Sequence, residues 1–296
     1  MRDTFSGYHP IINFTYFGLV IGFSMILMHP IALAVSLTAS MAYAINLEGS
    51  KAVIFSLKYA LPMMLLAAII NPAFSHGGVT ILCYLPTGNP LTLESILYGL
   101  AAAAMLASVL FWFRCYTMVM TSDKFVYIFG RIIPSLSLVL SMILRFVPKF
   151  KAQFDIVREA QRSIGRDISY GSTIKRMKNA VTIFSVMVTW SLENAIETAD
   201  SMKSRGYGLP GRTAFSIYKF DERDRDALIW LLFCGTYMIC GIIVGGLSWK
   251  YFPSIKGMLL QPFTISFLTI YLCMSLTPVV INRREEKKWE SLQSKI

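Results

Sequence analysis

Long apolar runs separated by shorter polar stretches dominate the pattern of hydrophobic and polar positions along this chain of 296 residues. An α-helix needs about 17–25 mainly apolar residues to cross the hydrocarbon core of a bilayer. Six runs come close to that length, at residues 11–28, 31–46, 53–70, 94–113, 227–247 and 259–281. The pattern therefore predicts an all-α integral membrane protein with about six transmembrane helices.

Proline and glycine mark the expected ends of several runs. His29-Pro30 predicts a tight turn between the first two runs. Asn71-Pro72 predicts the end of the third, because proline disfavours helix in the residue before it. Residues 73–93 contain several glycines and prolines, so they predict a loop.

Lys and Arg are distributed unevenly among the polar stretches, and these residues concentrate on the cytoplasmic side of membrane proteins. Residues 71–93 contain neither, whereas residues 114–226 contain 18 of the 28. The C-terminal tail adds Arg283, Arg284, Lys287, Lys288 and Lys295. Six crossings with both termini in the cytoplasm satisfy these placements, with Lys250 and Lys256 on the outer side as exceptions.

This topology divides the chain into three parts. We expect about four transmembrane helices in 1–113, cytoplasmic or membrane-proximal coupling helices in 114–226, and about two transmembrane helices with a basic tail in 227–296. The middle part contains two further apolar runs, 132–147 and 180–192. If both crossed the membrane, the basic residues of the intervening segment would face outward. We therefore favour helices that lie at the inner leaflet, with an eight-crossing arrangement as the alternative.

The composition indicates burial in a membrane. The chain is 55% hydrophobic and 15% charged, whereas a soluble domain has about 25% charged residues. The net charge of +11 follows largely from the cytoplasmic excess of Lys and Arg, which argues against nucleic-acid binding. The five cysteines lack CxxC spacing and the three histidines lie far apart, so neither disulfides nor a metal site are expected.

The common catalytic and nucleotide-binding motifs do not occur in the sequence. There is no GxxxxGK[ST] phosphate loop, so we do not expect this chain to bind ATP by that means, and there is no HExxH or GxSxG pattern. The predicted spans contain almost no ionisable residues, which disfavours an ion-coupled carrier and an intramembrane enzyme. We therefore expect a protein that is not an enzyme and binds no cofactor directly.

Two predicted helices of the middle part end in an arginine motif. The first, at about 150–163, closes with Gln161-Arg162-Ser163 and stops at Gly165, and the second, at about 190–205, closes with Ser204-Arg205-Gly206. Basic residues at helix C-termini offset the helix dipole, which is the simpler explanation. Guanidinium groups at exposed helix ends also suit bidentate pairing with carboxylates of a partner. The second helix has an apolar face with helical spacing, formed by Leu192, Ala195, Ile196, Ala199 and Met202.

Three stretches of the middle part resemble a known family. They are Leu144-Arg145-Phe146-Val147-Pro148, Glu159-Ala160-Gln161-Arg162-Ser163 and Ala199-Asp200-Ser201-Met202-Lys203-Ser204-Arg205-Gly206-Tyr207-Gly208. The chain resembles the transmembrane T component of energy-coupling factor (ECF) transporters, the EcfT/CbiQ family. Its first motif departs from the commoner Ala-Arg-Gly or Ala-Arg-Ser of that family but keeps the arginine.

The resemblance implies a non-catalytic, multi-pass scaffold in a bacterial or archaeal cell membrane. In this family the two motifs end coupling helices that sit in grooves of two ABC ATPase subunits. The matching positions here are Gln161, Arg162, Ser163, Ser204, Arg205 and Gly206. ATP would be bound by those partner subunits, and a membrane-embedded S component would capture a vitamin or a transition-metal ion. A conventional ABC permease that forms the pathway itself, and a structural membrane protein that binds anionic lipid, remain alternatives.

Overall fold

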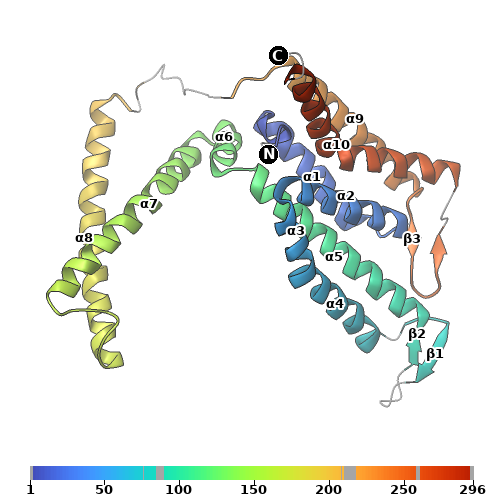
Figure 1. Ribbon diagram of the computed structural model, residues 1–296, viewed down its shortest axis with the longest axis horizontal. Coiled ribbons are helices and arrows are strands. Elements are labelled where there is room, and N and C mark those ends of the chain that lie inside the picture. The colour runs from blue at the N-terminus through green and yellow to red at the C-terminus, as the bar shows by residue number, and fades with distance from the viewer. Residues whose placement is uncertain are drawn as a thin grey trace. The chain divides into compact units, whose positions relative to one another are not determined.

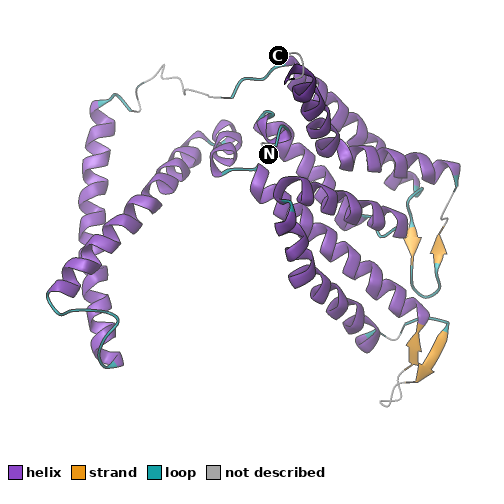
Figure 2. Cartoon of the chain, viewed as in Figure 1, coloured by secondary structure: helices purple, strands orange, loops and turns teal. Residues whose placement is uncertain are grey.

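The computed structural model describes residues 3–75, 77–84, 90–207, 209, 218–257 and 261–293. Gly208, Lys295 and the first two residues of the predicted run 259–281 lie outside these ranges. The chain separates into two units, one formed by Met1–Thr121 and Tyr218–Ile296 and the other by Ser122–Ile217. Both are built from helices, and the first unit also contains short strands (Figures 1 and 2).

Each apolar run predicted as a transmembrane segment corresponds to a helix of the first unit. After a 3₁₀ turn, η1 (Phe5–Gly7), these are α1 (Pro10–Ile26), α2 (Pro30–Glu48), α3 (Ser50–Phe55) with α4 (Leu61–Phe74), α5 (Leu93–Val119), α9 (Glu222–Val244) and α10 (Pro262–Gln293). Within the described ranges, five spans are long and apolar enough to cross a membrane, with α3 and α4 counted as one. The sixth helix, α1, is apolar but has 17 residues, the lower limit for a crossing. The all-α membrane fold is confirmed.

The third predicted span differs from the expectation at its C-terminal end. A π-helical stretch, η2 (Ser56–Ala60), joins α3 to α4, and α4 continues through Pro72 to Phe74. The prediction that Asn71-Pro72 ends the helix was therefore wrong. Close packing on α5 explains the difference: Asn71 donates a hydrogen bond to the Ser95 carbonyl at 3.1 Å. At Gly99, a Cβ would lie only 2.9 Å from the Ala68 carbonyl oxygen, so the two helices touch along their backbones.

Two short strands lie where the sequence predicted a loop. In 73–93, β1 (Ile81–Tyr84) pairs antiparallel with β2 (Pro90–Thr92). A second antiparallel pair, β3 (Trp249–Lys250) with β4 (Lys256–Gly257), lies between α9 and α10. Both pairs are short connections between membrane-length helices.

A polar network lies inside the apolar core of the first unit. The Ser24 hydroxyl is 2.6 Å from that of Ser36 and 3.1 Å from that of Tyr271. The indole nitrogen of Trp112 donates to Ser36 at 3.0 Å. All four residues are fully buried. Because a membrane interior offers no water, each polar group needs a protein partner, and this network supplies them across α1, α2, α5 and α10.

Polar contacts also hold one end of the first unit together. The Asn282 side chain in α10 accepts a hydrogen bond from the Thr4 amide at 3.0 Å and donates one to Asn46 at 3.2 Å. The Arg114 guanidinium of α5 pairs with Glu48 of α2 at 2.5 Å. The N-terminal segment, the C-terminal ends of α2 and α5, and the C-terminal half of α10 therefore lie at the same end of this unit.

The second unit contains α6 (Ser122–Ile132), α7 (Pro134–Ser163) and α8 (Thr173–Ser204). The helices predicted at 150–163 and 190–205 are the C-terminal parts of α7 and α8, which also include the apolar runs 132–147 and 180–192. Pro148 lies inside α7, where it removes a single backbone donor. Of the helices described, α7 and α8 are not among those apolar enough to cross a membrane, which disfavours the eight-crossing arrangement.

Candidate functional site

The C-terminal end of α7 is closed by a Schellman motif. The amide of Arg166 donates to the Gln161 carbonyl at 2.9 Å, and the amide of Gly165 donates to the Arg162 carbonyl at 2.9 Å. Gly165 has a φ of 78°, a left-handed conformation that side chains with a Cβ rarely adopt. The local sequence therefore stops α7 and presents Arg162 in its last turn.

The end of α8 has the same design. The amide of Tyr207 donates to the Met202 carbonyl at 3.1 Å, and the amide of Gly206 donates to the Lys203 carbonyl at 3.0 Å. Gly206 has a φ of 73°. Arg205 is the C-cap residue of α8 and is exposed. Both motif arginines therefore lie at helix ends that carry the same type of cap.

The two arginines occupy different positions within these caps. Arg162 lies three residues before its cap glycine, Gly165, whereas Arg205 directly precedes Gly206. The counterpart of Arg162 at the end of α8 is Lys203. Since each helical residue turns by about 100°, the two guanidinium groups leave their caps in different directions. The motifs look alike in sequence but present their charge differently in space.

Arg162 has an acidic neighbour in the connector between α7 and α8, which we define as residues 164–172. Its Nε lies 3.6 Å from the Asp167 carboxylate, while 68% of the Arg162 side chain remains exposed. The amide and hydroxyl of Ser169 hydrogen-bond to the Asp167 carboxylate and, together with Arg162 and Arg158, hold the pKa of Asp167 below its ordinary value. Asp167 is therefore charged at neutral pH.

The other motif residues are arranged around these caps. The hydroxyl of Ser163 donates to the Glu159 carbonyl at 3.0 Å, and that of Ser204 donates to the Ser201 carbonyl at 3.0 Å. The Gln161 side-chain oxygen is shielded from solvent and accepts no hydrogen bond from the described part of the chain. These serines complete the backbone hydrogen bonding of the last turn and leave the arginines as the exposed charged groups of each motif.

Contacts between α7 and α8 place the two arginine motifs far apart. Lys149 donates to Asn194 at 3.2 Å, and the rings of Phe150 and Trp190 lie 5.5 Å apart. Val157, further along α7, packs with Ile183, which comes earlier in α8. The helices are therefore antiparallel at this contact (Figure 1), and the short connector joins the end of α7, which carries Arg162, to the start of α8. The 32 residues of α8 span about 48 Å, so Arg205 lies at the distant end.

The apolar face predicted on the second helix is only partly covered. Leu192 and Ile196 are 62% and 65% exposed. Ala195 and Ala199 are also exposed, and Met202 is half-buried. No other described helix of the second unit packs over this face, so within this unit the face is open.

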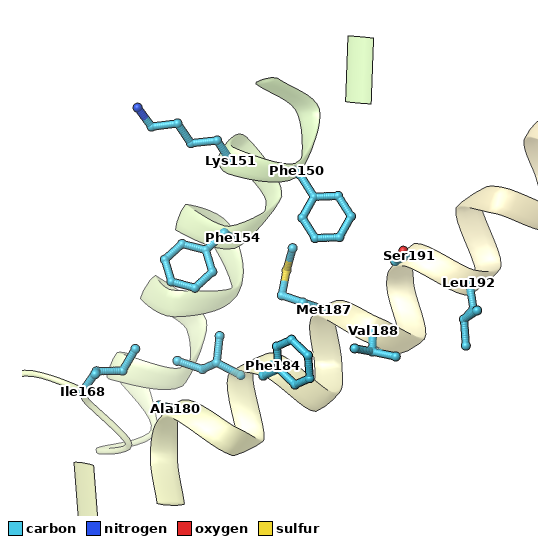
Figure 3. Close-up of a pocket in the computed structure, with 11 residues that line it drawn as sticks. Phe150, Lys151, Phe154, Ile168, Ala180, Phe184, Met187, Val188, Ser191 and Leu192 are labelled. Atoms are coloured by element: carbon cyan, nitrogen blue, oxygen red, sulfur yellow. The ribbon is translucent and has the colours of Figure 1, made fainter. Parts of the chain in front are cut away.

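A cavity of about 600 Å³ lies between α7 and α8. Figure 3 shows Phe150 of α7 and Met187 of α8 pointing toward each other, while Leu192 points away from α7. Most of the residues that line the cavity are apolar, and Lys151 and Ser191 supply its polar groups. The crossing is therefore loosely packed beside a small buried cluster of Val157, Ile183 and Met187.

Sequence reasoning missed the residues that brace the connector. The spacing of residues along the sequence did not reveal the hydrogen bonds that hold the connector. They are made by Asp167, Arg176 and Asn179. The tripeptide Asp167-Ile168-Ser169 is typical of an Asx turn, in which a carboxylate accepts the amide two residues on. That signal was available in the sequence, but the partners from α8 were not.

A metal site needs several side chains that together bind the ion. No group of three or more His, Cys, Asp or Glu residues in the described part of the chain could hold a metal ion. The five cysteines are free thiols. The chemistry of the candidate site therefore consists of exposed guanidinium groups, capped helix ends and apolar faces.

The fold and the candidate site are those of a multi-pass helical membrane protein. Its second unit contains a helix pair, and both helices of the pair end in a capped arginine motif. No protein-family model matches the chain. It is 36% identical over 109 residues to the energy-coupling factor transporter transmembrane protein EcfT of Lactobacillus helveticus, which covers 36% of this chain and 39% of that protein. It is 35% identical over 107 residues to EcfT 1 of Listeria monocytogenes, covering 35% and 40% of the two chains.

The similarity extends to further proteins of the same description. Over 105 residues the chain is 33% identical to EcfT of Lactococcus lactis, with 35% of this chain and 40% of that protein covered. The match thus spans about two fifths of the length of these curated relatives. These findings confirm the resemblance to the T component of ECF transporters that the arginine motifs indicated.

Proposed function

We propose that this chain is the transmembrane T component of an ECF-type ABC importer. It is a non-catalytic scaffold that couples ATP hydrolysis by two partner ATPase subunits to reorientation of a substrate-binding S component. The observation that carries the proposal is the pair of capped arginine ends on antiparallel helices, at the two extremes of α8. Two well-separated docking points suit two partner subunits better than one groove.

Exposed charge around Arg162 supports an acidic partner surface. Residues 158–178 include six basic residues and only two acidic ones, Glu159 and Asp167. The basic residues are Arg158, Arg162, Arg166, Lys175, Arg176 and Lys178, all of them exposed. A guanidinium group pairs most strongly with carboxylates, because its planar fork matches both oxygens. We therefore assign carboxylate-lined grooves of the ATPase subunits as the partners of both arginine ends.

The basic end of the first unit supports a cytoplasmic location for both termini. Arg223 and Arg225 lie in the first turn of α9, and Arg283, Arg284, Lys287 and Lys288 lie in α10. The Tyr8 ring, near the N-terminus, lies 4.2 Å from the Arg223 guanidinium. By the positive-inside rule this end faces the cytoplasm. The same end carries Thr121 and Tyr218, at which the chain leads into and out of the second unit.

In the proposed mechanism, this chain binds no ATP. ATP-driven closure of the partner subunits moves the two arginine-ended helices, and their apolar faces pass the movement to the S component. The exposed Leu192 and Ile196 face of α8 is available for such a contact. Specificity for a vitamin or a transition-metal ion then belongs to the S component.

Charge reversal at both arginines tests the proposal. The double variant Arg162→Glu and Arg205→Glu is co-expressed with ECF-type ATPase subunits and an S component from the same organism. We expect assembly with the ATPases to weaken at least about 100-fold, because each variant places like charges face to face. ATP-dependent uptake in proteoliposomes is lost with it.

The matched control is Lys287→Glu with Lys288→Glu, which changes the net charge equally on the proposed cytoplasmic side. It should assemble and transport normally. Normal assembly and transport by the Arg162 and Arg205 double variant would contradict the proposal. Transport without an S component would instead indicate a conventional permease. Salt-dependent binding to anionic liposomes without any ATPase partner would indicate a lipid-binding structural protein.

A further inference from the structure

The connector between α7 and α8 ties Arg162 to both helices. Asp167 is its central residue: the carboxylate lies 3.6 Å from the Arg162 Nε, and the main-chain carbonyl accepts a hydrogen bond from Asn179 of α8 at 2.9 Å. A distance of 3.6 Å is an ion-pair contact rather than a hydrogen bond. Asp167 therefore connects the exposed arginine of α7 to the N-terminal part of α8, where the Asn179 side chain is buried.

Two further contacts keep the connector in place. The carboxylate of Asp167 accepts the Ser169 amide at 3.0 Å, and Arg176 of α8 donates to the Ile168 carbonyl at 2.8 Å. Ile168 itself packs against the buried cluster of Val157, Ile183 and Met187. The connector is thus fixed by hydrogen bonds to α8 and by apolar contact with both helices.

Among the residues that the structure describes, no ion pair holds the arginine at the end of α8, Arg205. The side chain of Lys203, the counterpart of Arg162 in the cap, also makes none there. The two arginine ends therefore have the same type of cap, and within the described ranges the ion pair with Asp167 belongs to the Arg162 end alone.

We propose that Asp167 is a positioning residue, which holds Arg162 in a preformed orientation for docking into a carboxylate-lined groove of one ATPase subunit. This inference rests on the proposed function. It makes the Arg162 end a preorganised docking group. Preorganisation strengthens binding because less side-chain freedom is lost on association.

Removal of the Asp167 charge should change the docking affinity in opposite directions, depending on whether Asp167 positions Arg162 or acts only through its charge. An acidic residue beside a docking arginine repels a carboxylate-lined groove, so removal of its charge should tighten docking if charge alone acts. If Asp167 positions Arg162, the same removal weakens docking. Asn at this site keeps the Asx turn, because its side chain can still accept the Ser169 amide, whereas Ala removes both turn and charge.

The first experiment measures affinity. The full chain in lipid nanodiscs is titrated with a purified pair of ECF-type ATPase subunits from the same organism. We expect Asp167→Asn to bind about threefold more weakly, in keeping with the modest strength of an exposed ion pair, and Asp167→Ala about tenfold more weakly. The control, Asp155→Asn, removes the same charge from an exposed site on α7 without a described partner. It should bind as the unaltered chain does, or slightly more tightly.

The second experiment needs no partner. Hydrogen–deuterium exchange of the full chain in nanodiscs should be faster over 164–170 in Asp167→Ala than in the unaltered chain, with 203–207 unchanged. Affinity that stays equal or rises in both Asp167 variants would overturn the inference while leaving the proposed function intact. Affinity that stays equal when Arg162 and Arg205 are both reversed to Glu would instead overturn the proposed function, and the inference with it.

Discussion

The two units of this protein bury their side chains to very different degrees. The first unit encloses large side chains completely, among them Trp112, Tyr43 and Tyr271, and pairs its buried polar groups with one another. In the second unit the buried apolar cluster is small, while Leu192 and Ile196 are more than half exposed. Both units expose large apolar side chains, so the small described core is what sets the second unit apart. A helix pair with so small a core and an open apolar face on α8 is typical of a region that completes its packing on other molecules.

The difference in burial predicts different effects for substitutions in the two units. Substitutions in the first unit should act on global unfolding, because its core and hydrogen-bond network span the bundle. Substitutions in the second unit should act on docking and on local opening, because few contacts link its helices. Four predictions test this division, beginning with the largest effect.

Trp112→Ala should destabilise the first unit most. It removes a fully buried side chain and the donor to Ser36, and truncation of a buried Trp costs about 3–5 kcal/mol. Thermal unfolding of the chain in detergent should shift to markedly lower temperature. Trp112→Phe, which keeps most of the volume and loses the hydrogen bond, should cost only about 1 kcal/mol. An unchanged midpoint in the alanine variant would show that the bundle core is not where stability resides.

Met187→Ala should affect the second unit alone. Met187 is 4% exposed in the crossing of α7 and α8, and its truncation costs about 2 kcal/mol, at the low end for a buried Met because the adjacent cavity already loosens the packing. Hydrogen–deuterium exchange should rise over 150–157 and 183–190, with the helices of the first unit unchanged. A rise in exchange throughout the chain would contradict the division into two units.

Gly165→Ala and Gly206→Ala should each cost about 1 kcal/mol of local stability, because alanine disfavours the left-handed conformation of both residues. Gly206→Ala should cost more, since its Cβ would also lie 3.0 Å from the Leu209 side chain. Asn tolerates this conformation better, so the Asn variants are the matched controls. The order of these two stability losses is checked by hydrogen–deuterium exchange rates in the last turn of each helix, measured alongside the affinity for the ATPase subunits. Equal rates for Ala and Asn would argue against strain as the cause.

Leu192→Asn with Ile196→Asn should have the smallest effect on folding. Both side chains are mostly exposed, so the free energy of unfolding should change by no more than about 0.5 kcal/mol. The thermal midpoint should therefore stay nearly the same. The comparison variant is Ile183→Asn, which places a polar group at a site that is 1% exposed and should open the crossing. Under the proposed function, the exposed pair should nevertheless weaken co-purification with the S component. A large stability loss in the exposed pair would mean that this face is covered in the free chain.

Comparison of predicted and observed elements shows which kinds of signal were reliable. Span length and apolarity located every membrane helix of the first unit, because insertion depends on the local composition of a segment. The rule that proline ends a helix was wrong at Pro72, and Pro148 lies inside α7. A helix continues through proline where its remaining hydrogen bonds and its packing on a neighbour outweigh one lost donor.

The candidate site shows the same limit. Gly165 and Gly206 predicted both helix ends, since a left-handed cap depends on one residue type. The different placement of Arg162 and Arg205 within those caps, and the separation of the two ends along α8, required the backbone geometry. The roles of Arg162 and Arg205 in docking remain predictions.

The all-α membrane fold and the two arginine-ended helices could be predicted from the sequence, because hydrophobic length, charge distribution and cap residues are local properties of the chain. The antiparallel arrangement of α7 and α8, and the contacts of Asp167, Asn179 and Arg176 that brace the Arg162 end, are features of the tertiary structure. These contacts join residues from two helices and the connector between them. Their existence depends on how the helices pack, which no local pattern specifies.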